Sequence, residues 1–373
     1  MKRAIVSVIN DLSTDQRVHK VCTTLRGMGY DVMLVGRRQR KSMKLEPRAY
    51  SIRRMSLLFE KGPLFYAEFQ FRLFFLLLFQ KADVLVANDL DTLWPNYRIS
   101  KLKGCELVYD THELFCEVPE LRENPRKRNI WKRLERKIFP KLKFIFTVND
   151  SIAKIYTEEY GVPVRVVRNV PRRAVFKMVK TVDRKELGMP PDKKIIVLQG
   201  AGINIQRGAE EAVEAMQYVE NAILYIIGGG DVIGLLKEMV KELKLQDRVI
   251  FTGKMPFEKL IQYTRQADLG LTLDKDTNAN YRYSLPNKLF DYIHAEVPVL
   301  SSSLIEIKKV IDEYRIGAVI DSHEPKHIAE KINSILADAA SLAEWKKNTK
   351  IAAEKLNWEN EELQLKDVYQ QFL

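Results

Sequence analysis

Short apolar runs alternate with helix-like patterns along the first half of the chain. A helical pattern over residues 16–28, which ends before Gly29, separates the first two apolar runs, and the same rhythm recurs further along. Strand, helix and strand in regular alternation are typical of a parallel, doubly wound α/β sheet. The predicted strands of this first sheet are 4–9, 31–36, 82–88, 106–110, 144–149 and 164–169.

The alternation stops at residues 172–192, which are charged and contain Pro190 and Pro191, and then starts again. We interpret 172–192 as a linker between two domains of the same α/β architecture, 1–171 and 193–356, followed by a helical segment, 357–373. Open α/β sheets bind ligands beyond the carboxyl ends of their strands, so two Rossmann-like domains of this kind are expected to face a central cleft. The predicted strands of the second sheet are 195–200, 222–230, 248–253, 268–274 and 297–302.

The net charge of +12 is unevenly distributed along the 373 residues. Residues 1–180 contain 36 Lys and Arg against 19 Asp and Glu, a balance of +17, whereas residues 181–373 carry −5. The basic residues are densest at 122–143, where apolar side chains recur at helical spacing. We favour a contact with an anionic membrane surface for this segment, slightly over a solvated face, and rank nucleic acid last because no nucleic-acid-binding motif accompanies the charge.

The apolar segment 64–81 is too short and too interrupted by charge to span a bilayer. Together with 122–143 it could bind an anionic membrane surface, but we predict that 69–79 is mostly core. The short apolar run at 4–9 predicts a first strand rather than a signal peptide. Cys22, Cys105 and Cys116 are odd in number and lack metal-ligand spacing, which favours reduced thiols in a cytoplasmic protein. We therefore expect a cytoplasmic location, either in solution or peripheral on the inner face of the membrane.

Residues 281–300 hold the most informative pattern for function. A loop leads into a helix that is predicted to open with Pro286, and Lys288 and Asp291 lie three residues apart on one face. A helix start beside a lysine suits a phosphate, and a carboxylate one turn deeper can accept hydrogen bonds from sugar hydroxyls. The alternative is an ordinary surface ion pair between Lys288 and Asp291.

Two glycine-rich loops follow predicted strands in the same half of the chain. The loop 200–208 contains Gly200 and Gly202 and ends near Arg207, whose guanidinium could hold a diphosphate. The loop 228–231 contains Gly229 and ends in Asp231, for which helix capping is the favoured role. Each loop alone is weak evidence, because any turn from a strand to a helix can use glycine.

The first half offers candidates after three strands. The loop 10–15 lacks the three spaced glycines of a dinucleotide site; Asp15 could cap the next helix, and Arg17 could reach a ligand. Asp89 and Asp91 could hold a metal, but we prefer caps and first-turn acids. His112 follows another strand and could donate to a sugar hydroxyl or a phosphate; the alternative is a structural histidine.

Taken together, these motifs resemble the retaining glycosyltransferases of the group 1 type, family 4 in the sequence classification, which have the two-domain GT-B fold. The similarity covers nearly the whole chain. QGAGINIQRG resembles the loop that ends in a basic residue and glycine, SLPNKLFDYIHAEVPVL the donor-binding helix and the next strand, and YDTHEL the segment with the strand-end histidine. NWENEELQLKDVY resembles the closing helix that crosses back to the first domain.

The resemblance implies roles for individual residues. Arg207 and Lys288 would bind the donor diphosphate, Asp291 would hold the ribose hydroxyls, and His112 would contact the donor sugar near the scissile bond. The base would lie near 252–255. The catalytic candidates are therefore His112, Arg207 and Lys288, and the donor-binding candidates are Asn10, Asp11, Arg17, Gly200, Gly202, Gly229, Thr252, Lys254, Ser284, Asn287 and Asp291.

The chain also departs from the family pattern. Tyr283 stands where a glutamate usually contacts the donor sugar, Asp291 replaces a glutamate, and Gly202 replaces a second basic residue. Arg17 or helix starts would then have to meet part of the diphosphate charge.

The predicted activity is that of a hexosyltransferase that moves a sugar from a nucleoside-diphosphate sugar to a glycan or lipid-linked acceptor, with retention, in cell-surface polysaccharide synthesis. No cofactor and no metal are expected. The alternatives are an epimerase or inverting transferase on the same fold, and a non-catalytic nucleotide-sugar-binding protein.

Overall fold

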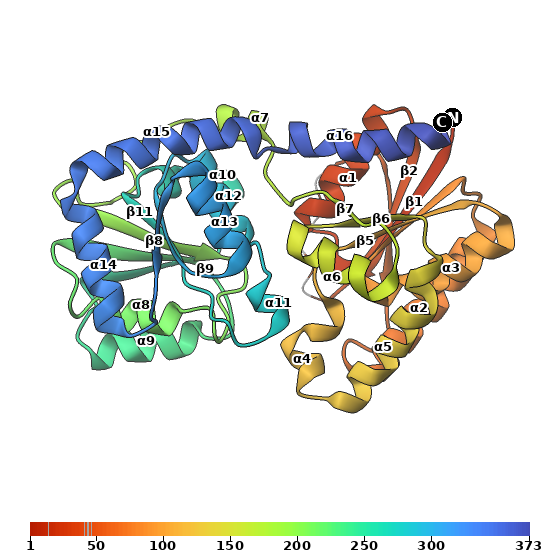
Figure 1. Ribbon diagram of the computed structural model, residues 1–373, viewed down its shortest axis with the longest axis horizontal. Coiled ribbons are helices and arrows are strands. Elements are labelled where there is room, and N and C mark those ends of the chain that lie inside the picture. The colour runs from red at the N-terminus through yellow and green to blue at the C-terminus, as the bar shows by residue number, and fades with distance from the viewer. Residues whose placement is uncertain (14, 41, 43–44, 46) are drawn as a thin grey trace. The chain divides into compact units, whose positions relative to one another are not determined.

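The computed structural model describes residues 1–13, 15–40, 42, 45 and 47–373 (Figure 1). They form two compact units, which we describe separately. Unit 1 comprises Met1–Asn169 together with Asn360–Leu373, and unit 2 comprises Val170–Glu359. Residues 172–192, expected to be a linker, lie in unit 2, where residues 173–178 form a short helix.

Unit 1 is built on a parallel sheet with the strand order β3-β2-β1-β4-β5-β6-β7. The chain adds strands on one side of β1 up to β3 and then on the other side from β4 onward, with β1 and β4 parallel neighbours. Its strands are β1 (Arg3–Asp11), β2 (Asp31–Arg38), β3 (Ser51–Ser56), β4 (Val84–Asn88), β5 (Glu106–Thr111), β6 (Phe144–Thr147) and β7 (Arg165–Val166). Its helices are α1 (Gln16–Gly27), α2 (Gly62–Phe79), α3 (Leu90–Lys103), α4 (Pro119–Arg122), α5 (Pro125–Ile138), α6 (Asp150–Tyr160) and the end of α16 (Trp358–Tyr369), with 3-10 turns η1 (Phe115–Glu117), η2 (Phe139–Lys141) and η3 (Gln370–Phe372).

The first helix of unit 1 shows how the sequence directs the local fold. Asp15 accepts a hydrogen bond from the backbone N–H of Val18 and caps α1, as the sequence predicted. Val18, Val21 and Leu25 recur at helical spacing and are buried against the sheet. This burial fixes the β1–α1 loop at the carboxyl edge of the sheet.

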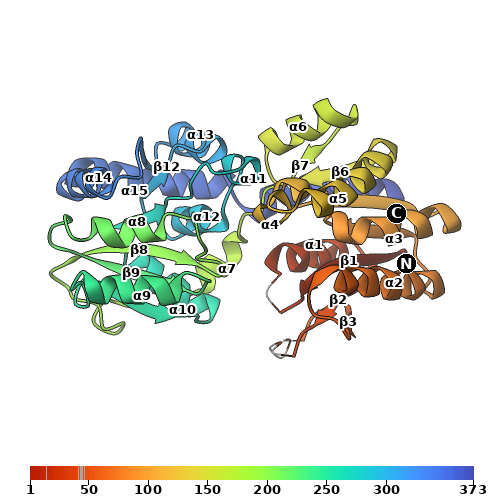
Figure 2. The same cartoon turned by 90° about the horizontal axis from the view of Figure 1, so that it is seen from below.

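Unit 2 repeats the architecture with the strand order β10-β9-β8-β11-β12-β13, again with all strands parallel, and the order turns back between β8 and β11. Figure 2 shows β8, β9 and β12 among the helices of this unit. Its strands are β8 (Lys194–Gly200), β9 (Ala222–Gly228), β10 (Val249–Gly253), β11 (Leu269–Thr272), β12 (Val299–Ser302) and β13 (Gly317–Ile320). Its helices are α7 (Arg173–Met178), α8 (Ala209–Ala215), α9 (Ile233–Glu242), α10 (Phe257–Arg265), α11 (Ala279–Arg282), α12 (Asn287–His294), α13 (Ile305–Tyr314), α14 (Pro325–Ala337), α15 (Ala339–Lys355) and the start of α16.

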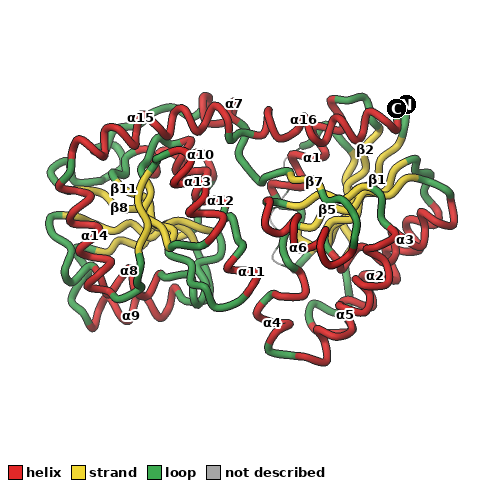
Figure 3. Tube along the Cα trace, in the orientation of Figure 1, coloured by secondary structure: helices red, strands yellow, loops and turns green. Residues whose placement is uncertain are grey.

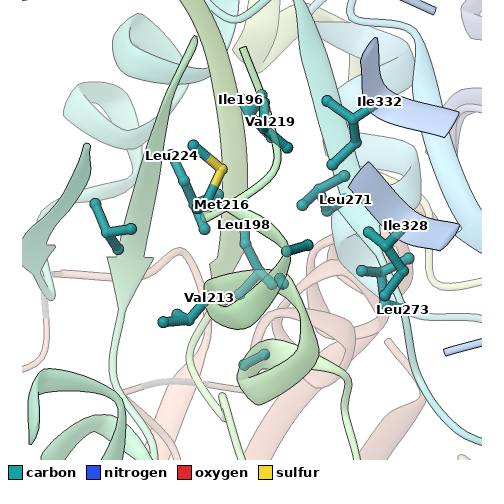
Figure 4. Close-up of a cluster of buried hydrophobic side chains, with 14 of the residues drawn as sticks. Ile196, Leu198, Val213, Met216, Val219, Leu224, Leu271, Leu273, Ile328 and Ile332 are labelled. Carbon is teal, nitrogen blue, oxygen red and sulfur yellow. The ribbon is translucent and has the colours of Figure 1, made fainter. Parts of the chain in front are cut away.

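A large apolar cluster lies between one face of the unit 2 sheet and helices α8, α9 and α14 (Figure 4). Leu198 and Leu271 contribute from the strands, and Val213, Ile328 and Ile332 from the helices, all at most 1% exposed. The helices packed on this face bury the strands and hold them in place, so the loops that follow the strands are fixed in position. Parallel pairing brings all their carboxyl ends to one edge, where ligands bind in such sheets.

The last residues of the chain pack on unit 1 (Figure 3). Thr24 donates a hydrogen bond to Glu362, and the hydroxyl of Tyr30 donates to the backbone carbonyl of Tyr369 at 2.6 Å. The ring of Tyr369 also contacts Phe146 of β6. Residues 360–373 therefore complete the packing of a domain whose remaining residues end near position 169.

Helix α2 corrects the prediction that 69–79 is mostly core. Phe69, Leu73 and Leu77 are fully buried, but Phe71 and Phe79 are 64% and 78% exposed. Among the residues described, α2 is the one helix long and apolar enough to cross a membrane by length and composition. Its sequence is apolar on nearly all sides, so the pattern could not indicate which side faces the core.

Candidate functional site

Two cations that the sequence singled out meet at one buried carboxylate in unit 2. The side chain of Asp274, which is 0% exposed, accepts from Arg207 Nη1 at 2.8 Å through one oxygen and lies 3.2 Å from Lys288 Nζ through the other. Arg207 and Lys288 come from distant parts of the sequence, and Asp274 brings them to the same point. Residue 274 is the last position of a predicted strand, and the sequence pattern predicts no role for it.

The charge state of Asp274 follows from its surroundings. Burial alone would raise its pKa, but Lys288 and Arg207 outweigh burial and lower the pKa of this carboxyl. Thr272 also donates to it at 3.2 Å. Asp274 is therefore ionised at neutral pH, and it holds two cations close together before any ligand is present.

Gly208 allows Arg207 to reach Asp274. It has a φ of 72°, and a Cβ at this position would lie 2.2 Å from the carbonyl oxygen of Leu273. Only glycine permits this combination of left-handed backbone and close approach. The loop after β8 is thereby held against the end of β11, one residue from Asp274.

The aromatic ring of Tyr281 lies under the Arg207 guanidinium, whose carbon is 4.7 Å from the ring centroid. Asn278 caps the short helix α11 by accepting from the N–H of Tyr281 and so fixes the start of this turn. Stacking restricts the guanidinium to one plane, which favours a defined geometry toward a ligand. Tyr283, which replaces the expected glutamate, is the C-cap of α11.

The side chains of Lys288 and Asp291, both on α12, contact different residues, so they are not an ordinary surface pair. Pro286 is the N-cap of α12 and not its first helical residue, a one-residue correction to the prediction. Asp291 accepts from the Gln199 side-chain amide at 3.1 Å, and Gln199 in turn accepts from buried Thr264 at 2.6 Å. This chain of hydrogen bonds orients the Asp291 carboxylate beside the end of β8.

The two glycine loops pack directly against each other. Gly229 donates its N–H to the Gly200 carbonyl at 3.1 Å, and Ile203 donates to the Gly229 carbonyl at 2.9 Å. A Cβ on Gly229 would lie 2.6 Å from Lys254 Cε, so the exposed Lys254 side chain lies over this loop. Gly202 is exposed at the same edge.

Four further predicted residues of unit 2 carry polar side chains. Asp231 accepts the N–H of Ile205 and Val232 is the N-cap of α9, so the capping role favoured for Asp231 is wrong. Asn287 is exposed as the first residue of α12. The hydroxyl oxygens of Ser284 and Thr252 are buried, and no described residue offers either one a hydrogen-bond partner.

His112 lies within a charged network at the carboxyl edge of the unit 1 sheet. Its Nδ1 is 3.2 Å from Asp89, and its Nε2 is 3.2 Å from the Asn88 side-chain oxygen and 3.5 Å from Asp110. Burial favours the neutral ring, but Asp89 and Asp110 outweigh burial and raise the pKa of His112 to about 9. The imidazole is therefore a cation at neutral pH.

Asp89 occupies the N-cap position of α3, as the sequence favoured, but its side chain accepts no capping hydrogen bond from the residues described in this helix. Its carboxylate instead accepts from the backbone N–H of His112 at 2.8 Å. Its φ of 59° is rare for a residue with a side chain, and such strain is concentrated at functional sites. Asp91 lies in the first turn of α3, as expected, and burial raises its pKa well above the usual value.

Arg17 also departs from its predicted role. It is buried and donates two hydrogen bonds to the Asp110 carboxylate, from Nε at 3.0 Å and from Nη2 at 2.7 Å. Its third nitrogen, Nη1, donates to the Val167 carbonyl. Its charge is thus committed to the network that contains His112 and is not available to a diphosphate. Burial disfavours the ionised form of Asp110, but Arg17 and His112 lower the pKa of this carboxyl below its usual value.

The loop after β1 is ordered by its own side chains. Asp11 accepts from Ser13 and from Arg54, the latter at 2.9 Å, and exposed Asn10 donates to Asp15 at 3.0 Å. The loop thus forms a polar edge on unit 1, with Asn10 accessible to solvent.

Comparisons with known families agree with this geometry. Residues 179–352 match the family described as "Glycosyl transferases group 1", and residues 15–171 match "Glycosyltransferase Family 4". The chain belongs to the group 1 glycosyltransferases. The two matches cover most of the sequence, with one in each of the two α/β sheets.

Curated relatives within the glycosyltransferases match over part of their length. A D-inositol 3-phosphate glycosyltransferase of Xylanimonas cellulosilytica is 22% identical over 204 residues, which is 52% of this chain and 46% of the relative. An N-acetyl-alpha-D-glucosaminyl L-malate synthase of Bacillus anthracis is 23% identical over 172 residues, or 45% and 43% of the two chains. The chain spans about half the length of the curated relatives it matches.

Solved glycosyltransferase structures show the same fold over the whole chain. The sucrose-phosphate synthase from Thermosynechococcus elongatus has a TM-score of 0.81 at 18% identity and is covered to 99%, with 100% of this chain. Anabaena HepE, solved in complex with UDP-glucose, has a TM-score of 0.72 at 13% identity, and both chains are fully covered. The GT-B fold class expected from the sequence, with two Rossmann-like parallel sheets, is confirmed.

Proposed function

We propose that this group 1 glycosyltransferase transfers a sugar from a nucleoside-diphosphate sugar, with retention of the anomeric configuration. The observation that carries the proposal is the convergence of Arg207 and Lys288 on buried Asp274 at the carboxyl edge of the unit 2 sheet. Ligands bind at this edge in parallel sheets, and two fixed cations there suit a diphosphate. The structure of Anabaena HepE holds UDP-glucose, which makes uridine the first base to test.

The proposed reaction breaks the bond between the anomeric carbon and the β-phosphate oxygen, and forms a bond from that carbon to an acceptor oxygen. The leaving diphosphate gains negative charge, which Arg207 and Lys288 would stabilise where they already stand. The leaving phosphate oxygen would take the acceptor's proton on the same face, which gives retention. Asp291, oriented by Gln199, would accept from the ribose hydroxyls.

The diphosphate charge is met by side chains in this proposal, so no metal takes part. Transfer is then expected to persist in the presence of a chelator. The role that the family resemblance implies for His112, contact with the donor sugar, remains a separate proposal that rests on its cationic ring.

For the acceptor, we propose a glycan or a lipid-linked glycan in cell-surface polysaccharide synthesis, handled at the inner face of the membrane. Support comes from the basic segment 122–143. Helix α5 carries a pocket lined by Arg128, Asn129, Lys132, Arg133 and Arg136, a charge pattern that suits an anionic headgroup.

A transfer assay tests the proposed reaction. The purified chain is incubated with UDP-, GDP- and ADP-sugars and a glycan acceptor, and NMR of the product reports the anomeric linkage. Lys288→Ala is expected to lower turnover by about 100-fold, whereas Lys308→Ala, at an exposed i,i+4 pair with Asp312, serves as a matched control and is expected to keep it. A Lys288→Ala protein with full turnover, or a product with inverted configuration, would contradict the proposal.

A further inference from the structure

The outer face of α2 is a row of exposed aromatic side chains. Phe71, Phe75 and Phe79 follow one another at four-residue spacing; the ring centroids of Phe71 and Phe75 are 4.7 Å apart, and those of Phe75 and Phe79 are 6.5 Å apart. Leu64, two turns before Phe71 on α2, is also exposed. Single exposed apolar residues are common, but a contiguous row of this kind marks an interaction surface.

The preceding loop adds two further apolar side chains to this row. Glu68 accepts hydrogen bonds from the backbone N–H groups of Leu58 at 2.9 Å and Phe59 at 3.0 Å, and it pairs with Arg72 at 2.7 Å. These bonds hold the loop against α2, and the side chains of Leu58 and Phe59 are left exposed. We define the docking face as Leu58, Phe59, Leu64, Phe71, Phe75 and Phe79.

The opposite side of α2 is fixed inside unit 1. Phe69, Leu73 and Leu77 are buried, Tyr66 contacts Trp131 of α5 at 5.3 Å, and Phe74 contacts Trp94 of α3 at 5.8 Å. A helix held in this way cannot leave its domain to cross a bilayer. It can only present its outer face to a flat apolar surface, as an interfacial helix does.

The charges around the docking face are mostly positive. Exposed Lys61 precedes the helix and exposed Lys81 follows it. The two acids nearby are each paired with an arginine, Glu60 with Arg40 and Glu68 with Arg72. Exposed phenylalanines bordered by lysines match the acyl and anionic headgroup layers of a membrane interface. A second copy of the chain would bring the same cations together and repel.

We propose that the docking face inserts into the interfacial layer of an anionic phospholipid bilayer and orients unit 1 on the membrane. This contact is separate from the basic segment 122–143 and does not depend on the transfer reaction. The phenylalanines supply the apolar insertion, and the flanking Lys61 and Lys81 supply the preference for anionic lipid.

Co-sedimentation with lipid vesicles in the absence of any donor tests this proposal. The wild-type chain, the triple variant Phe71→Ser/Phe75→Ser/Phe79→Ser and the control Leu235→Ser/Ile305→Ser/Ile351→Ser are each mixed with phosphatidylcholine vesicles with and without phosphatidylglycerol. The control residues are exposed apolar side chains of unit 2. All six positions are exposed, so circular dichroism is expected to show that both variants fold.

We expect wild type and control to sediment with the anionic vesicles, and the triple variant to partition on the order of 100-fold more weakly. Removing phosphatidylglycerol should weaken the binding of wild type. Equal partitioning of the triple variant and wild type would overturn the proposal. So would a wild-type chain that ignores vesicles and is a dimer in sedimentation velocity, if the triple variant is a monomer, because a second copy would then cover the face.

Discussion

The two cations expected at the diphosphate would repel each other if nothing lay between them. Asp274 removes this repulsion and fixes both side chains, which makes it a positioning residue that acts through Arg207 and Lys288. In unit 1, Asp89 and Asp110 play the corresponding part for cationic His112. Each cluster thus contains a buried carboxylate, Asp274 or Asp110, because a buried charge is stable only with a partner.

We expect Asp274→Asn to separate turnover from ground-state binding. The variant frees Arg207 and Lys288 from their fixed positions, which should lower kcat by about 10- to 100-fold. It also removes a negative charge from the site, so the Kd for the nucleoside diphosphate should not weaken in proportion. Steady-state kinetics and calorimetry measure the two quantities. Asp276→Asn, at an exposed pair with Arg282, is the matched control, and an unchanged kcat in Asp274→Asn would refute the positioning role.

The raised pKa of His112 predicts a loss of stability at alkaline pH. The folded-state pKa of about 9 exceeds the usual 6.5, so the stabilisation is complete below pH 6.5 and disappears as the pH rises through 9. Its size is at most about 3 kcal/mol. Chemical unfolding of wild type and His112→Gln between pH 6 and 10 measures it. Parallel pH profiles for the two proteins would show that His112 is not held as a cation.

At the scale of elements, the loops that join each strand to the next helix determine which side chains meet in the charged cluster of unit 2. The loops after β8, β9 and β11 meet because glycines remove the side chains that would separate them. Gly228 is an example, since a Cβ there would lie 1.8 Å from the Gly200 carbonyl oxygen. The close approach of these loops is what brings Arg207 beside the end of β11.

Gly208→Ala is expected to be destabilising and to weaken nucleotide binding together. The left-handed φ and the 2.2 Å approach to Leu273 exclude a Cβ, so the loop has to move, at a cost of about 1–3 kcal/mol. Gly234→Ala in α9 is the matched control, because nothing lies within 4 Å of its Cβ position, and it should stabilise by about 0.5–1 kcal/mol. Thermal unfolding with and without UDP measures both. A Gly208→Ala protein as stable as wild type would contradict this account of the loop.

The alternation of apolar runs with helical patterns was enough to predict both sheets, except for strands β3 and β13. β3 has the sequence SIRRMS and shows no apolar run, whereas β13 is an apolar run of only four residues, GAVI, too short to stand out. The sequence also identified Arg207 and Lys288, but not the carboxylate between them. Asp274 is 67 positions from Arg207, and a contact at that separation leaves no trace in local spacing.

At the scale of the whole molecule, two sheets with the same order each place a charged cluster at their carboxyl edge. Unit 2 holds the candidate donor site, and unit 1 holds the cationic His112 and the docking face. Residues 360–373 also belong to unit 1, so unit 1 is built from two segments that lie far apart in the sequence.

Tyr369→Ala is expected to destabilise unit 1. The ring is 1% exposed and contacts Tyr30 and Phe146, so its loss leaves a cavity that costs about 3 kcal/mol. Leu363→Ala, at a position on the same helix that is exposed, should change stability by less than about 0.5 kcal/mol. Differential scanning calorimetry of the two variants measures the difference. Equal unfolding temperatures would show that residues 360–373 do not contribute to the core of unit 1.

Titration calorimetry with UDP, GDP and ADP tests the central claim most directly, that Arg207 and Lys288, held by Asp274, form a nucleoside-diphosphate site. We predict that one of the three binds wild type with one site per chain. The double variant Arg207→Ala/Lys288→Ala should bind it at least about 100-fold more weakly, and Lys308→Ala should bind it like wild type. Binding of equal strength to the double variant, or no binding of any of the three to wild type, would contradict the account.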